Sequence, residues 1–230
     1  MRLLVTRPEP DGTRTAAALR QRGHEVLLAA LLRIESVDFE LPKSDCAAVV
    51  LTSANTARAI AQHPGRGSLT VLPAFTVGRQ TAEAAHAAGF TQVTSADGDR
   101  NDLAALLRAR FGGSHTPLLY LAGEDRAGDL ADCGVAVETV VAYRAVKVAR
   151  FPPAAAEALG RLGGVLHFSR RSAEAYLACA GAAGLLGPAL APVQFCLSRQ
   201  VAEPLTQAGA ADVRVALRPN EAALIELVPN

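Results

Sequence analysis

The sequence contains no tryptophan, and its other aromatic residues are few, with seven phenylalanines and three tyrosines among 230 residues. A protein that binds single-stranded nucleic acid stacks bases on aromatic rings, and this composition offers little for that purpose. Charges of the two signs nearly balance, with a formal net charge of +1, whereas proteins that bind phosphate backbones or acidic membranes carry basic excess. We therefore expect neither nucleic acid nor a membrane as a partner.

Several motifs of nucleotide and metal chemistry are also missing. The chain has no G-x-G-x-x-G and no G-x-x-x-x-G-K-[ST], so the phosphate-binding turns of dinucleotide and P-loop folds have no support. Its four cysteines, at 46, 133, 179 and 196, form no C-x-x-C pair, which disfavours zinc and fits free thiols in a reducing compartment. The apolar run Val26 to Leu32 is far too short to span a bilayer, and no signal peptide is evident. We expect a cytoplasmic protein without a bound metal.

Short apolar runs alternate with alanine-rich amphipathic runs along the whole chain. "LLVTR" reads as a buried strand, and "DGTRTAAALRQRG" reads as a helix that a glycine ends. The same order recurs in "AAVVLTSANTARAIAQH", "AFTVGRQTAEAAHAAG", "GVLHFSRRSAEAYLACAG" and "VQFCLSRQVAEPLTQAG". Strands separated by helices of this length predict parallel sheets covered on both faces, so the expected fold class is α/β.

Parts of the sequence occur twice. "FTVGRQTAEAAHAAGF", from Phe75, aligns without a gap with "FCLSRQVAEPLTQAGA", from Phe195, and "TSANTARA" matches "FSRRSAEA". "LLVTRPEP" at the start resembles "LLYLAGED", but this unit comes first in one set and last in the other. Alanine-rich units resemble one another through composition alone, yet here Arg-Gln, Glu and Gly also align. The order predicts two similar α/β domains, one inserted in the other.

The predicted outer domain comprises residues 1–36 and 147–230, and the predicted inserted domain comprises residues 37–146. Two long runs rich in β-formers, 25–37 and 137–148, lie at the two crossings between these domains. They predict a two-stranded β linker that acts as a hinge. No long exposed apolar stripe is evident in the pattern, so we expect a monomer.

The predicted strands end in short turns that carry hydroxyls and arginines. Parallel sheets bind ligands beyond the carboxyl ends of their strands, and each turn here leads into a helix whose first N–H groups and dipole attract anions. Helix capping alone explains each hydroxyl singly, and the same geometry serves both purposes. The candidate anion-binding residues are Arg7, Thr52, Ser53, Gly78, Arg79, Thr81, Ser169, Arg170 and Ser198.

Two residues stand apart from these turns. Tyr143 lies in "VVAYRAV", within the second crossing, where its phenol is placed to donate a hydrogen bond or a proton to a bound group. A packing aromatic on a β ribbon is the alternative for this residue. His167 falls within a predicted strand and is either a core residue or a ligand-facing one. No Ser-His-Asp arrangement is predicted.

Taken in order, these motifs resemble the uroporphyrinogen-III synthase family over the whole chain. The matching stretches are "LLVTRP", "VVLTSANTARAI", "FTVGRQTAEAAHAAGF", "SADGDRNDLAALL", "LLYLAGEDRAGDL", "VETVVAYRA", "HFSRRSAEAY" and "CLSRQVAEPL". The resemblance implies two flavodoxin-like domains, one inserted in the other, joined by a two-stranded linker. It implies a lyase of tetrapyrrole synthesis that dehydrates and cyclises hydroxymethylbilane with inversion of ring D, without metal or organic cofactor.

The resemblance also implies roles for particular residues. Tyr143 matches the linker tyrosine that assists departure of the hydroxyl group, and Arg7 matches an N-terminal arginine. Thr52, Ser53, Gly78, Thr81, Ser169 and Ser198 match turns that bind the substrate carboxylates. The chain departs from the family where Ala122 replaces an arginine, and we expect Arg126 to substitute for it.

Two other functions compete with this one. A two-domain anion-binding module without catalysis would use the same helix termini but would not need Tyr143. A cofactor-dependent transferase on paired Rossmann-like domains is disfavoured because no glycine-rich phosphate loop is present.

Overall fold

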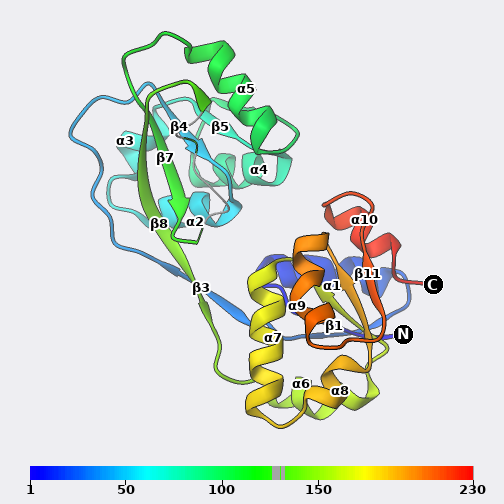
Figure 1. Cartoon of the computed structure of the whole chain (residues 1–230). Helices are drawn as coiled ribbons and strands as arrows, with labels where there is room; N and C mark the ends of the chain where they lie inside the picture. Colours follow the sequence, from blue (N-terminus) through cyan, green and yellow to red (C-terminus); the bar gives the residue numbers. More distant parts are fainter. Residues whose placement is uncertain (126–129, 131–132, 230) are drawn as a thin grey trace. The chain divides into compact units, whose positions relative to one another are not determined.

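The structure, a computed structural model, describes residues 1–125, 130 and 133–229. Its strands form two sheets, of five and six strands, with helices between most consecutive strands (Figure 1). The chain divides into two compact units, one of Met1–Arg33 with Val146–Asn230 and one of Ile34–Ala145. The parallel α/β fold predicted from the sequence is confirmed.

The first unit is built on the five-stranded sheet, whose order is β11-β10-β9-β1-β2 and whose paired strands are all parallel. Its strands are β1 (Arg2–Val5), β2 (Glu25–Leu28), β9 (Gly164–His167), β10 (Val193–Cys196) and β11 (Val213–Val215). Its helices are α1 (Asp11–Gln21), α6 (Pro153–Ala158), the short 3₁₀ helix η2 (Leu159–Arg161), α7 (Arg170–Ala182), α8 (Leu186–Leu190), α9 (Arg199–Gln207) and α10 (Glu221–Glu226).

The core of the first unit is centred on β1. Leu3, Leu4 and Val5 are fully buried, as expected for a central parallel strand that helices cover on both faces. On the neighbouring strand β9, Gly164 leaves room for a ring, because a Cβ there would lie 2.4 Å from Phe195 Cε2. The apolar runs seen in the sequence therefore form the buried strands of this unit's core.

The second unit is built on the six-stranded sheet, whose order is β3-β8-β7-β4-β5-β6. Its strands are β3 (Leu32–Ser36), β4 (Ala48–Leu51), β5 (Ala74–Thr76), β6 (Val93–Ser95), β7 (Leu118–Gly123) and β8 (Val137–Lys147). Its helices are α2 (Ala54–Gln62), α3 (Arg66–Thr70), α4 (Arg79–Ala88) and α5 (Arg100–Phe111).

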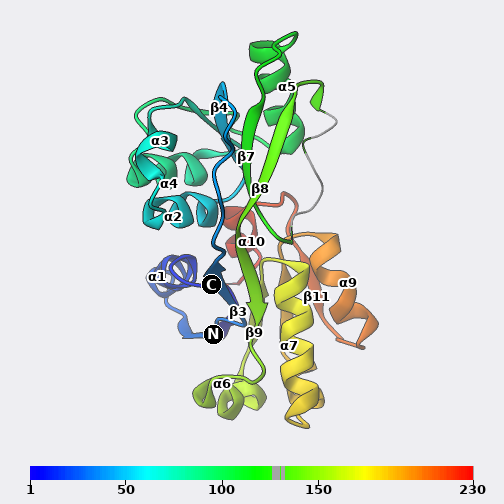
Figure 2. The same cartoon turned by 90° about the vertical axis from the view of Figure 1, so that its left-hand side faces the viewer.

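Helices cover both faces of this second sheet. Figure 2 shows α2, α3 and α4 gathered on one side of the unit and α5 apart from them. Ile60 of α2 packs with Leu51 and Leu121 in one buried cluster, whereas Leu107 of α5 packs with Tyr120 in another. Alternate residues of one strand thus serve different cores, which is the period-two rule of β-structure.

The first predicted linker run, residues 25–37, contains two strands, β2 and β3. Its first part is β2, which pairs in parallel with β1 at the edge of the five-stranded sheet. The N–H of Ala29 still donates to the Val5 carbonyl over 2.9 Å, so the chain follows β1 to its end before it turns. Only β3 lies next to β8, where the Val37 N–H donates to the Ala142 carbonyl over 3.0 Å.

Candidate functional site

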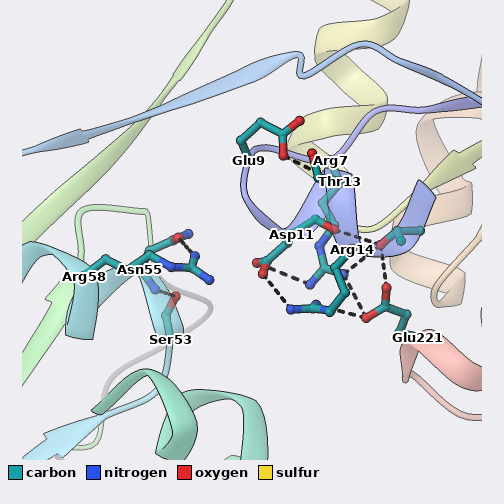
Figure 3. A network of polar contacts seen from close by, with 10 residues as sticks. Arg7, Glu9, Asp11, Thr13, Arg14, Ser53, Asn55, Arg58 and Glu221 are labelled. Atoms are coloured by element: carbon teal, nitrogen blue, oxygen red, sulfur yellow. Dashed lines mark hydrogen bonds and ion pairs between the residues drawn. The ribbon is translucent and has the colours of Figure 1, made fainter. Parts of the chain in front are cut away.

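Two consecutive hydroxyl residues, Thr52 and Ser53, follow β4 in the second unit. Ser53 has an extended backbone and caps α2, because its side-chain oxygen accepts the Asn55 N–H over 3.2 Å (Figure 3). The Thr52 hydroxyl lies 2.9 Å from the hydroxyl of Tyr120, a residue of β7 that the sequence did not single out. One hydroxyl contact therefore ties the turn to α2, and the other ties it to β7, the strand beside β4.

Tyr143 of β8 is half-buried and packs against the apolar cluster that covers the α2 and α4 face. Burial raises the pKa of its phenol, a hydrogen bond with Ser53 lowers it, and nearby Tyr120 raises it again, with a net upward shift. The phenol is therefore protonated at neutral pH, the form that carries a hydrogen to donate. The Ser53 hydroxyl is therefore a polar partner of the phenol within this unit.

The next turn along this sheet follows β5 and begins α4. Gly78 is the N-cap residue in extended conformation, and within the described chain no side chain caps this helix. Thr81 is buried and its N–H donates to the Gly78 carbonyl over 3.0 Å, while Arg79 is exposed. A helix N-terminus without a capping side chain leaves its first N–H groups to water or an anion.

In the first unit as well, one helix has a capping side chain and another has none among the described residues; they follow β9 and β10. Ser169 caps α7 in a capping box with Ser172, whereas Ser198, at the start of α9, makes no capping hydrogen bond to residues the structure describes. The duplicated turns Gly78 and Ser198 thus share one property: neither offers a side chain to its own helix.

The two predicted arginine ligands of the first unit have carboxylate partners. Arg170 pairs with Glu174 at 3.1 Å and also with Glu203. Arg7, which follows β1, lies 3.5 Å from Asp11 and 3.2 Å from Glu221, with its guanidinium over the Phe168 ring. A contact of either arginine with a substrate carboxylate stays a prediction, and it would require the present partners to be exchanged.

Glu221, the first residue of α10, is the residue that organises the Arg7 side of this unit. It accepts from Arg7 and Arg14, and Arg14 also bonds to Asp11 at 3.0 Å (Figure 3). Burial raises the pKa of Glu221, but the Thr15 hydroxyl and both arginines outweigh it, so the pKa is lowered. No signal in the sequence pointed to Glu221, since its partners lie at the other end of the chain.

The predicted residues thus fall into groups by unit. In the second unit the structure brings Ser53 and Tyr143 together and places Thr52 beside them. In the first unit Arg7, Ser169 and Ser198 follow β1, β9 and β10, which are neighbours in the sheet. Arg126 lies outside the described residues.

The remaining candidates for chemistry are accounted for by packing. His167 is fully buried and bonds to Gln194 at 2.9 Å, so of its two predicted environments the structure places it in the core. Among the described residues no group of three or more His, Cys, Asp or Glu side chains is arranged to hold a metal ion. In the same part of the chain no helix has the length and apolar character needed to cross a bilayer.

Two comparisons with known proteins point to one family. The family profile described as "Uroporphyrinogen-III synthase HemD" matches residues 13–226. The uroporphyrinogen-III synthetase of Helicobacter pylori aligns with a TM-score of 0.67 and 18% identity, covering 99% of this chain and 98% of that one. A mutant uroporphyrinogen III synthase of Thermus thermophilus aligns with a TM-score of 0.52 and 17% identity, covering 99% and 97%. A sequence search of curated proteins gives no match. The chain belongs to the uroporphyrinogen-III synthase family.

Proposed function

We propose that the chain is a lyase that removes water from hydroxymethylbilane, a linear tetrapyrrole, and closes it with ring D inverted. Membership of the family makes the chain an enzyme of tetrapyrrole synthesis, the uroporphyrinogen-III synthase; the reaction class and the residue roles are our proposal. The observation that carries these roles is the half-buried, protonated phenol of Tyr143, held beside the hydroxyl turn at the end of β4.

Tyr143 is proposed to assist the loss of water. Its phenol donates toward the substrate hydroxyl, the C–O bond breaks, and the hydroxyl leaves as water while the pyrrole N–H gives up its proton to form an azafulvene. The substituted carbon of ring D attacks this azafulvene, whose nitrogen regains a proton. The spiro intermediate then fragments and recloses. Because burial raises the pKa of the phenol, it serves better as a hydrogen-bond donor than as a full acid, so its contribution is partial.

The helix N-termini are proposed to hold the substrate carboxylates. α4 and α9 begin at Gly78 and Ser198 without a capping side chain in the described chain. The Thr81 and Val201 N–H groups donate to the Gly78 and Ser198 carbonyls, and the N–H groups that precede them are proposed to bind the anion. Thr52, Ser53, Arg79, Thr81 and Ser169 belong to the same set of turns. Such a cradle suits a flexible polycarboxylate, because positioning of the reacting carbons is the main requirement of this chemistry.

The wider organisation is part of the same proposal. We retain an outer domain of residues 1–36 and 147–230, an inserted domain of residues 37–146, and a monomeric enzyme. A cytoplasmic location is supported by the cysteines, since Cys46, Cys133, Cys179 and Cys196 are all free thiols.

The deciding experiment is an isomer assay. Fresh hydroxymethylbilane is incubated with the protein, the products are oxidised, and the type I and type III uroporphyrins are separated. Uncatalysed closure gives type I, so mainly type III product is expected. Tyr143→Phe should lower kcat by roughly 100-fold, the low end for loss of a general acid. Only type I product with the wild-type chain would reject the enzyme and favour the anion-binding module.

A further inference from the structure

A β-bulge lies next to Tyr143. β7 and β8 pair in parallel with Leu121 opposite Val140 and Ala122 opposite Val141, but Gly123 stands opposite Tyr143. Ala142 is therefore the extra residue on β8. Bulges re-aim the side chain that follows them and occur often beside active sites. Beyond the bulge the two strands stay joined, because the Glu124 N–H donates to the Tyr143 carbonyl over 2.9 Å.

Gly123 provides the space that the re-aimed ring occupies. A Cβ built on Gly123 would lie 2.6 Å from Tyr143 Cζ, 2.8 Å from its hydroxyl oxygen and 3.0 Å from Cε2. The end of the phenol, which carries the reactive O–H, therefore rests directly on the backbone of β7. Gly123 is not among the glycines with positive φ, so contact and not backbone conformation explains the need for glycine here.

Three residues fix the position of the Tyr143 ring. Gly123 limits how far the ring end can move toward β7, Ala142 sets the direction of the side chain, and Ser53 bonds to the hydroxyl. Ser53 is itself held, since its oxygen accepts the Asn55 N–H. Each contact lies within the second unit.

We propose that Gly123, together with the bulge at Ala142, is a positioning element that aims the Tyr143 hydroxyl at the substrate. This inference rests on the proposed role of Tyr143. Gly123 is a positioning residue and not a catalytic one, because it acts only through the ring that lies on it.

Gly123→Ala tests the proposal and should leave the fold intact. The atoms that the new methyl group meets are the far end of one side chain, so the ring can move while the backbone stays. Ordinary contact begins near 3.4 Å, and the ring end must therefore shift by several tenths of an ångström. A misplacement of about 1 Å costs roughly 100-fold in rate, so we expect kcat to fall by about that factor with KM little changed. The matched control is Gly67→Ala, where a Cβ meets nothing within 4 Å.

Two further measurements connect the effect to Tyr143. The chain has three tyrosines, so ¹³Cζ-tyrosine NMR gives three resonances, and Tyr143→Phe identifies one of them. In Gly123→Ala that resonance should shift and its pKa should change. In the Tyr143→Phe background, Gly123→Ala should cost no further activity, as expected for two residues that act as one unit.

The outcomes separate this inference from the proposed function. An unchanged kcat and an unchanged Tyr143 resonance in Gly123→Ala would overturn the positioning role. An equal loss of kcat in the Tyr143→Phe background would overturn it as well, because Gly123 would then act by another route. Wild-type activity of Tyr143→Phe alone would instead reject the role of Tyr143, and with it the catalytic reason for this geometry.

Discussion

His167 should make the stability of the protein fall in mild acid. The residue ends β9 with no exposed surface, and burial lowers its pKa from 6.5 to about 4, against a smaller upward effect of the hydrogen bond with Gln194. The Gln194 amide nitrogen donates to the carbonyls of Ala189 and Pro192 at 3.1 and 2.8 Å. Its oxygen must therefore accept from His167 Nε2, which fixes the neutral tautomer.

Protonation of this tautomer would charge the core. The second ring nitrogen, Nδ1, is buried and has no hydrogen-bond partner in the structure's described part, so a proton there would be both charged and unpaired. Above pH 6.5 the folded and unfolded states both hold a neutral ring, and His167 adds no pH dependence. As the pH falls from 6.5 toward 4, only the unfolded state takes up the proton, and stability is lost.

The size of the loss follows from the shift. Each pKa unit corresponds to about 1.4 kcal/mol, so the change from 6.5 to about 4 gives a loss of about 3 kcal/mol. That is a large share of the roughly 5–15 kcal/mol by which a domain is stable. Carboxylates that titrate in the same range add their own contribution, so the quantity to measure is the difference between two variants.

The assay is urea unfolding of the wild type and of His167→Gln at several pH values between 7.5 and 4. The variant keeps a donor toward Gln194 but does not titrate, so its deficit in unfolding free energy should shrink by about 3 kcal/mol as the pH falls. His115→Gln, at an exposed position, should follow the wild-type profile. Parallel profiles for wild type and His167→Gln would refute the reasoning, as would an NMR titration of folded His167 near pH 6.5.

Three further substitutions test single contacts. Ser53→Ala removes the cap of α2, and the unfolding free energy in urea should fall by about 1 kcal/mol. The same change removes the hydrogen bond to Tyr143 and should raise the pKa of its phenol further. An unchanged ¹³Cζ titration would contradict the Ser53 contact. Gly164→Ala places a methyl group against the Phe195 ring and should cost about 1–3 kcal/mol, whereas Gly160→Ala, with open space around it, should not lower the melting temperature. Glu221→Gln removes one partly buried carboxylate from two arginines and should lower the unfolding free energy by about 1–2 kcal/mol at neutral pH. This effect should disappear in acid as Glu221 protonates. A loss that persists in acid would reject the ion pairs as its cause.

The sequence by itself determined the fold class, the family and the position of the candidate turns. Apolar runs that alternate with amphipathic ones predict parallel strands and covering helices, because burial on both faces demands continuous apolar strands. Ser53 and Ser169 were readable as helix caps since a cap bonds to N–H groups only two or three residues away. Information of this kind lies within a few neighbouring residues.

Only the tertiary structure decided which distant groups meet. It divided the run 25–37 between two sheets, gave Arg7 a carboxylate from the last helix, and placed His167 in the core. It also set Gly123 against the Tyr143 ring through one extra residue on β8. These pairings depend on strand order and register, and no short stretch of sequence contains them, because the partners become neighbours only when the sheets form.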